Sequence, residues 1–228
     1  MNGRRSSKCA AASCRNNDGQ MTTKERILAI ALRQFNEIGT DQATVRSIAE
    51  EMGISHGNLC YHFRNTDALI EALYDSLIEE VDEQVFRAQQ PDSGLNAMIE
   101  SAELTFRLLY KYRFLLLDFV RIIRRIDSLR EKFRQLMQLR RLQFHQAFQQ
   151  FIDKGLMREE WVPGLYDHLI TNLLVLGDNW IPNAEIHFDE KGEVVIRYYL
   201  DAFLALLIPY LTEKGVKEYQ RLVELGNV

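Results

Sequence analysis

The strongest constraint on the fold is a pair of short helical patterns joined by a three-residue turn. Apolar residues recur at three- and four-residue spacing over residues 45–52, and Thr44 stands before them as a helix cap. Gly53 ends this run, as glycine commonly does just past a helix. Ser55 then caps a third, short helix whose apolar residues turn inward.

A further amphipathic pattern precedes this pair. It starts at Thr22 or Thr23, either of which can cap a helix, and it runs to Gly39, where we expect the helix to end. Residues 40–43 are then expected to form a loop. A helix, a loop, a helix, a glycine-containing turn and another helix make up the helix-turn-helix plan.

The start of the third helix has the side chains that reading DNA requires. In this plan the second helix of the pair lies in the major groove, and its N-terminal residues face the bases. Ser55, His56, Gly57 and Asn58 are polar or small and suit that position. Gly57 would let the backbone approach DNA closely, and an asparagine can pair with adenine or with a phosphate.

Three more side chains extend this candidate surface. Tyr61 and His62 can reach backbone phosphates, which fixes the register of the protein without reading sequence. Arg46, near the start of the second helix, can point along the groove, where arginine paired with guanine is the commonest specific contact. The alternative for Arg46 is an ordinary solvated surface charge. Leu59 and Phe63 are expected in the core.

Charge gives only weak support for a nucleic-acid partner. The chain has a formal net charge of -4, and residues 21–67 hold five Lys or Arg against six Asp or Glu. The local field rather than the total charge governs DNA binding, so this sum does not exclude it. It does count against very tight non-specific binding.

The rest of the chain is also helical in character. Leu, Ile, Arg, Glu and Gln are abundant, and only 4 prolines and 12 glycines interrupt 228 residues. A fourth helix begins at Asn65 or Thr66 and ends before a break at residues 89–94. Further helices are expected near residues 94–111, 113–126, 128–154, 163–181, 193–212 and 215–225. The predicted fold class is all-α.

The sequence contains no recognisable enzyme motif. Its five histidines form no HExxH pattern, and it lacks CxxC, P-loop, GxSxG and Rossmann glycine patterns. His56 and His62 lie six residues apart, which places them on different faces of a helix. We therefore expect no catalytic site, no metal and no cofactor.

Residues 1–20 differ in composition from the rest of the chain. This segment has no apolar period and an excess of basic residues, which is typical of a disordered tail or of an over-long start before Met21. The alternative is a basic arm that adds DNA affinity.

Cys9, Cys14 and Cys60 form no even disulfide framework, which favours a reducing cytoplasm. The longest uncharged run near the C-terminus is too short to cross a bilayer.

Residues 22–73 resemble the DNA-binding domain of TetR-family transcriptional regulators. Apolar, glycine and cap positions agree with that family in order and spacing. These positions are Ala31, Phe35, Gly39, Thr44, Ile48, Ala49, Gly53, Ser55, Gly57, Leu59, His62, Phe63 and Leu69. The resemblance assigns phosphate contacts to Thr44, Tyr61 and His62. It assigns groove contacts to Arg46, His56 and Asn58.

Two positions depart from the family pattern. Cys60 stands where tyrosine is usual, and Thr66 stands where lysine is usual. Both usual residues can touch the DNA backbone, so we expect fewer phosphate contacts, or their replacement by Arg64, Tyr61 or the basic tail. Fewer contacts predict a shallow salt dependence of DNA binding.

The resemblance further implies a homodimer whose C-terminal domain binds a small-molecule effector. The candidate ligand-binding residues are Phe106, Tyr110, Phe114, Phe119, His168, Asn172 and Trp180, with Asp178 as a further polar candidate. The alternative is that these aromatic residues are simply core. By family position, residues 165–181 and 193–211 are the candidate dimer interface, which would form a four-helix bundle.

These expectations divide the chain into a tail (1–20), a DNA-binding domain (21–67) and an effector-binding and dimerisation domain (68–228). The predicted function is that of a ligand-responsive repressor on a palindromic double-stranded DNA operator. The alternative is a helical adaptor that keeps the fold but no longer reads DNA, and the weak positive charge, Cys60 and Thr66 are the features that favour it.

Overall fold

The computed structural model describes residues 21–88, 90 and 94–224, so the expectations for residues 1–20 lie outside it. Within these residues the structure is helical, which confirms the all-α prediction. Its elements are α1 (Thr23–Gln42), α2 (Val45–Met52), α3 (His56–His62), α4 (Thr66–Ala88), α5 (Leu95–Lys111), α6 (Arg113–Leu117), α7 (Phe119–Arg125), α8 (Asp127–Asp153), α9 (Leu165–His187), α10 (Glu193–Ala205), a 3₁₀ turn (Ile208–Tyr210) and α11 (Glu213–Glu224).

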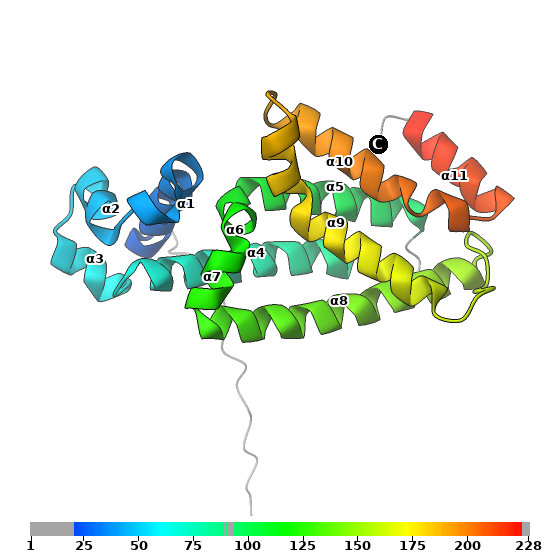
Figure 1. Cartoon of the computed structure of the whole chain (residues 1–228), viewed down its shortest axis with the longest axis horizontal. Coiled ribbons are helices and arrows are strands. Elements are labelled where there is room, and N and C mark those ends of the chain that lie inside the picture. The colour runs from blue at the N-terminus through cyan, green and yellow to red at the C-terminus, as the bar shows by residue number, and fades with distance from the viewer. Residues whose placement is uncertain (1–20, 89, 91–93, 225–228) are drawn as a thin grey trace, which may run out of the picture.

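Helices α1 to α3 form a small head at one end of the molecule (Figure 1). The predicted caps are confirmed, because the side chains of Thr22, Thr44 and Ser55 each accept a hydrogen bond from a backbone N–H three residues on. The start of α4 is capped by Asn65 rather than Thr66, with the N–H of Ala68 at 2.9 Å from Asn65 Oδ1.

The predicted break at Gly39 is confirmed, but the loop predicted for residues 40–43 is wrong, because a further helical turn follows. Gly39 has φ 77, outside the helical region, so the helix is kinked there. One more turn follows it, and the N–H of Ala43 bonds the carbonyl of Gly39 at 3.2 Å. Thr40 in this turn is buried against the body of the molecule, which explains why the chain does not open into a loop.

A larger body follows, in which α4, α5, α8, α9 and α10 pack around an apolar core (Figure 1). Helix α4 starts beneath the head and continues along α5 into the body, so one rigid element belongs to both parts. No described helix has both the length and the apolarity that a membrane crossing needs.

Three predicted boundaries in the body are wrong. The expected helix over residues 113–126 is split at Asp118, which separates α6 from α7. Helix α9 continues to His187 in spite of Pro182, because buried residues on both sides of the proline hold the helix in place. Helix α10 ends at Ala205 instead of 212, and Pro209 lies in the 3₁₀ turn that follows.

Candidate DNA-binding surface and ligand cavity

A tight turn sets the angle between α2 and α3. Gly53 has φ 72, a left-handed conformation that only glycine adopts without strain. The N–H groups of Gly53 and Ile54 both bond the carbonyl of Ala49, which closes α2. Ser55 then opens α3, because its Oγ accepts the N–H of Asn58 at 3.1 Å. The predicted role of Ser55 as a cap is therefore confirmed.

Helix α3 buries one face and presents the other to solvent. Leu59 is fully buried in the head, as predicted. His56, Gly57 and Asn58 are exposed on the first turn, and Tyr61 is 86% exposed one turn later. Its ring contacts that of His62 and is otherwise open to solvent, which leaves its hydroxyl accessible to an external partner.

Gly57 is not required by the fold of the protein alone. It lies inside α3 without a positive φ, and a Cβ placed on it would meet nothing within 4 Å. Glycine within a helix costs roughly 0.5–1 kcal/mol relative to alanine. A glycine that costs stability and relieves no internal clash is expected where an external surface approaches the backbone.

Thr44 and Arg46 lie at the start of α2. The Oγ1 of Thr44 accepts the N–H of Ser47 at 3.1 Å, and Ser47 Oγ accepts the N–H of Thr44 at 3.0 Å. The Arg46 side chain is 80% exposed and pairs with Glu50 at 3.2 Å. An exposed pair of this kind contributes little to stability, so it can be exchanged for an external anion at small cost.

The remaining predicted contacts lie around the end of α3. His62 is half-buried, with its ring edge-on to that of Tyr61 at 5.3 Å. Arg64 is exposed just beyond the helix. Cys60 is half-buried, and its Sγ lies 3.5 Å from Nε2 of His56, so it contacts a candidate groove residue rather than solvent alone.

A buried glutamine braces α1 against α2, and sequence reasoning did not identify it. Gln34 donates to Glu51 Oε2 at 2.8 Å, and Gln34 Oε1 accepts the hydroxyl of Ser47 at 2.7 Å. The hydrogen bonds from Gln34 and then Arg33 hold the pKa of Glu51 below its usual range. The sequence does contain a sign of this contact, because Gln34 is a polar residue within the apolar stripe of α1.

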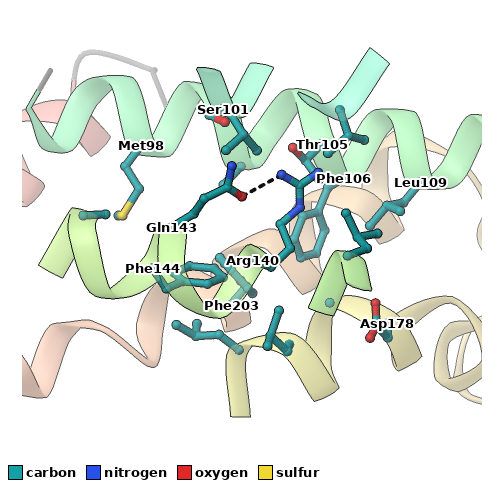
Figure 2. A pocket seen from close by; sticks show the side chains of 18 of the residues that line it. Met98, Ser101, Thr105, Phe106, Leu109, Arg140, Gln143, Phe144, Asp178 and Phe203 are labelled. Carbon is teal, nitrogen blue, oxygen red and sulfur yellow. Dashed lines mark hydrogen bonds between the residues drawn. The ribbon is translucent and has the colours of Figure 1, made fainter. Parts of the chain in front are cut away.

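The body contains an apolar cavity of about 210 Å³, enclosed mainly by α4, α5, α8 and α9 (Figure 2). Aliphatic and aromatic side chains such as Val81, Leu109 and Phe144 make up most of its wall. Cavities with apolar walls and a few polar groups are the usual form of small-molecule sites.

Of the predicted ligand residues, Phe106 lines this cavity. Trp180 does not line it, because it lies fully buried behind Phe106 with the two rings stacked at 5.3 Å. Tyr110 does not line it either. Its ring lies 6.1 Å from that of Trp180, and its hydroxyl accepts the N–H of Gly192 at 2.8 Å. These two residues therefore support the wall from outside.

Phe114 and Phe119 also lie outside the cavity lining. The ring of Phe114 packs on that of Phe35 in the head at 5.0 Å. The ring of Phe119 meets that of Phe133 at 4.6 Å. Phe114 therefore belongs to the junction of head and body and Phe119 to a contact between α7 and α8, and the sequence pattern predicted neither.

His168 and Asn172 are on the wrong face of α9 to line the cavity. Both are exposed, whereas Leu173, Gly177 and Asp178 line it. Positions four residues apart share a helix face, so His168 and Asn172 point outward together. Asp178 is the polar candidate whose predicted inward orientation the structure bears out.

Two ionisable groups line the cavity. Arg140, whose side chain is 10% exposed, pairs with Asp82 at 2.6 Å and donates to Gln143 at 2.8 Å. Burial raises the pKa of the Asp178 carboxyl to about 7. Sequence reasoning did not name Arg140 as a ligand residue; its position on the apolar stripe of α8 was the missed signal.

An exposed polar recognition helix on a three-helix head, joined to a helical body with an apolar cavity, defines a helix-turn-helix transcriptional regulator. Profiles of two parts of one family match the chain. The profile of bacterial regulatory proteins of the tetR family matches residues 27–73, and that of the TetR bacterial transcriptional repressor matches residues 73–219. The chain belongs to the TetR family of bacterial transcriptional regulators, a family of DNA-binding proteins rather than enzymes.

Individual relatives resemble mainly the head. The chain is 39% identical over 54 residues to the tetracycline repressor protein class A of Escherichia coli, covering 24% of this chain and 25% of that protein. It is 32% identical over 76 residues to the transcriptional regulator TtgR of Pseudomonas putida, covering 33% and 36%. The chain therefore spans about a quarter to a third of the length of these curated relatives.

Solved structures resemble the whole chain. A TetR-family regulator from Marinobacter aquaeolei has a TM-score of 0.81 at 25% identity, covering 90% of this chain and 98% of that one. The ketosteroid transcriptional regulator KstR2 of Mycobacterium tuberculosis has a TM-score of 0.56 at 18% identity, covering 86% and 98%, and shows the shared fold alone.

Proposed function

We propose that this protein is a ligand-responsive repressor that binds a near-palindromic operator as a homodimer. The observation that carries the proposal is the exposed first turn of α3, where His56 and Asn58 flank a glycine that the fold does not need. A backbone that must approach the floor of the major groove accounts for all three residues.

The proposed contacts divide into two kinds. Arg46, His56 and Asn58 read base edges, and Ser55 and Gly57 allow close approach. Phosphate contacts come from Thr44, Tyr61, His62 and Arg64. The Oγ1 of Thr44 accepts a backbone N–H as a cap, which leaves its hydroxyl hydrogen for a phosphate oxygen.

The proposed dimer pairs α9 and α10 of two protomers in a four-helix bundle. Both helices bury one face in the body and expose apolar side chains on the other. Val175 and Ile186 are exposed on α9 and Val194 and Tyr198 on α10, and Ile208 is exposed in the 3₁₀ turn that follows. His168 and Asn172 share the exposed face of α9, so we assign them to this interface instead of the cavity.

The proposed switch works through contacts between head and body. Thr40 in α1 donates to Asp118 at 3.0 Å, and Asp67 at the start of α4 pairs with Arg125 at 2.9 Å. A ligand that prefers one position of these helices changes the spacing of the two heads. Coupling energies of 1–3 kcal/mol would change operator affinity by roughly 5–150-fold.

The domain limits follow from this arrangement. We place the DNA-binding domain at residues 21–67 and the effector-binding and dimerisation domain at 68–228, with α4 continuous between them. Action on chromosomal DNA would place the protein in the bacterial cytoplasm.

A gel-shift assay tests the proposal. Purified full-length protein is titrated into a labelled duplex from upstream of its own gene, with a shuffled duplex of the same composition as the control. A regulator shifts the upstream duplex at lower concentration than the shuffled one. A helical adaptor would shift neither, or both alike.

A further inference from the structure

The cavity contains one acidic side chain without a partner. Asp178 lies on α9 in a wall that is otherwise mostly aliphatic and aromatic (Figure 2). Among the described residues, none forms a hydrogen bond or ion pair with its carboxylate. Pro182, four residues later, has no N–H to donate to the main-chain carbonyl of Asp178. The carbonyl of Asp178 therefore has no N–H donor four residues on, where a helix usually provides one.

The basic group in the cavity is already neutralised. One terminal nitrogen of Arg140 is 2.6 Å from a carboxylate oxygen of Asp82, and the other is 2.8 Å from Gln143 Oε1. Figure 2 shows the second of these bonds, with Asp178 apart from it. Taken together, Arg140, Asp82 and Asp178 leave one net negative charge, located at Asp178. An anionic ligand could not pair with Arg140 without displacing Asp82.

An acidic groove lies outside the cavity, between α4 and α8. Three acids and one lysine line it, namely Asp75, Glu79, Asp82 and Lys132. The groove and the cavity share Ile78 and Leu136 as wall residues. The ion pair of Asp82 with Arg140 joins the two spaces, because Asp82 lines the groove and Arg140 lines the cavity. Asp75 pairs with Lys132 at 2.6 Å and Asp82 pairs with Arg140, so Glu79 supplies the net negative charge of the groove, which favours a cation there over an anion.

Tyr74 adds an unpaired polar group at the groove. Its hydroxyl is buried without a hydrogen-bond partner, and the residue lines the groove. Burial and then the negative charge of Asp178 raise the pKa of Tyr74 to about 12. The hydroxyl of Tyr74 has no hydrogen-bond partner, and the negative charge of Asp178 acts on it electrostatically.

We propose that the effector is an amphiphilic amine whose apolar body fills the cavity and whose ammonium group pairs with Asp178, entering through the groove between α4 and α8. The inference rests on the proposed function, because it names the ligand class of that switch. An apolar cavity of about 150 Å³ takes up benzene, so this somewhat larger one suits a single ring with a short chain.

The pH dependence of binding follows from the groups that face Asp178. Among the titratable residues, Arg140 of α8 lines the cavity and pairs with Asp82 of α4, and Tyr74 of α4 interacts electrostatically with Asp178, whereas the cavity residues of α5 and α10 have no titratable side chains. Arg140 keeps its charge, and an alkyl ammonium stays protonated through this range. Since the Asp178 pKa is about 7 in the empty cavity, amine affinity should fall about tenfold from pH 8 to pH 6.

Calorimetric titration of the full-length protein with three matched probes tests the proposal. The probes are 4-phenylbutylamine, the neutral 4-phenylbutan-1-ol and the anionic 4-phenylbutanoate. At pH 8 the amine should bind about tenfold or more tightly than the alcohol, because hydrogen bonds to charged groups are the stronger ones. Asp178→Asn should remove this preference. Glu190→Gln, the same charge change at an exposed acid that lines neither the cavity nor the groove, should leave the preference within about twofold of the native value.

The proposal is overturned if the alcohol or the carboxylate binds as tightly as the amine, if Asp178→Asn keeps the preference, or if none of the three probes binds. The pH series uses only the native protein, so it tests whether amine binding depends on the ionised Asp178 carboxyl even if Asp178→Asn fails to fold. Operator binding is measured separately. A protein that selects the amine but binds no operator contradicts the proposed function alone, and one that binds operator but treats the probes alike contradicts the ligand class alone.

Discussion

The side-chain oxygen of Asn36 in α1 accepts a hydrogen bond from the N–H of Phe114 at the start of α6, at 3.1 Å. The amide nitrogen of the same side chain donates to the carbonyl of Lys111 at 2.8 Å. One side chain of the head thus satisfies two backbone groups where α5 ends and α6 begins. This contact joins head and body, as do those of Thr40 with Asp118 and of Asp67 with Arg125.

Replacing Asn36 by alanine should loosen this joint. The two backbone groups lose their partner, which should lower the free energy of unfolding by about 1–3 kcal/mol. Urea unfolding followed by circular dichroism measures this loss. The matched control is Asn58→Ala, an exposed asparagine of the same head, which should change stability by less than about 0.5 kcal/mol. Equal stability of the two variants would show that the Asn36 contacts contribute nothing.

Replacing Gly57 by alanine should have opposite effects on stability and on DNA binding. Helix propensity should raise the free energy of unfolding by about 0.5–1 kcal/mol, since the added Cβ meets no other atom. Operator affinity should fall, because the methyl group stands between α3 and the groove. Gly177→Ala in α9 is the control: it gains the same helix propensity without touching the head. A Gly57→Ala protein that binds operator as well as the native one contradicts the proposed docking.

The local features of the head could be predicted from the sequence because their causes are local. A cap needs a side-chain oxygen and an N–H three residues on, so Thr22, Thr44 and Ser55 were identifiable from neighbouring residues. The exposed face of α3 followed from the same periodicity that buried Leu59. The all-α fold class is confirmed for the same reason.

The cavity could not be predicted in this way, because its lining depends on how each helix of the body is rotated. Sequence reasoning selected the bulky aromatic residues, but Trp180 and Phe114 are packing residues behind or beside the wall. It overlooked Arg140 because an arginine within a basic run is usually solvated. Only its contact with Asp82, on a helix far away in sequence, shows that the charge is buried and balanced.

Salt should weaken operator binding less steeply than the number of candidate DNA contacts suggests. Arg33 and Arg46 are paired with glutamates of the head, and Cys60 and Thr66 replace two residues that commonly contact phosphates in this family. Each missing phosphate contact flattens the slope of log K against log salt concentration by about 0.9. Fluorescence anisotropy at four salt concentrations measures the slope. A value as steep as about −8 would be incompatible with so few contacts.

Asp178 should make the stability of the protein fall as pH rises. Its pKa is about 7 in the folded protein and 3.8 as a free group, so the unfolded chain loses the proton first. Between about pH 4 and 7 the native protein should therefore lose stability relative to Asp178→Asn by at most about 1.4 kcal/mol per pH unit, and the difference should level off above pH 7. Urea unfolding of both proteins at pH 5, 6, 7 and 8 tests this. A difference that does not change with pH would show that the carboxyl is not desolvated.

The central claim is that α2 and α3 read DNA, and Arg46→Ala tests it most directly. Operator affinity is measured by fluorescence anisotropy for the native protein, for Arg46→Ala and for the control Arg130→Ala, which removes an arginine paired to a nearby acid in α8, outside the head. The account predicts that Arg46→Ala loses about 1–3 kcal/mol of operator affinity while Arg130→Ala binds as the native protein does. Native affinity in the Arg46→Ala protein would contradict it.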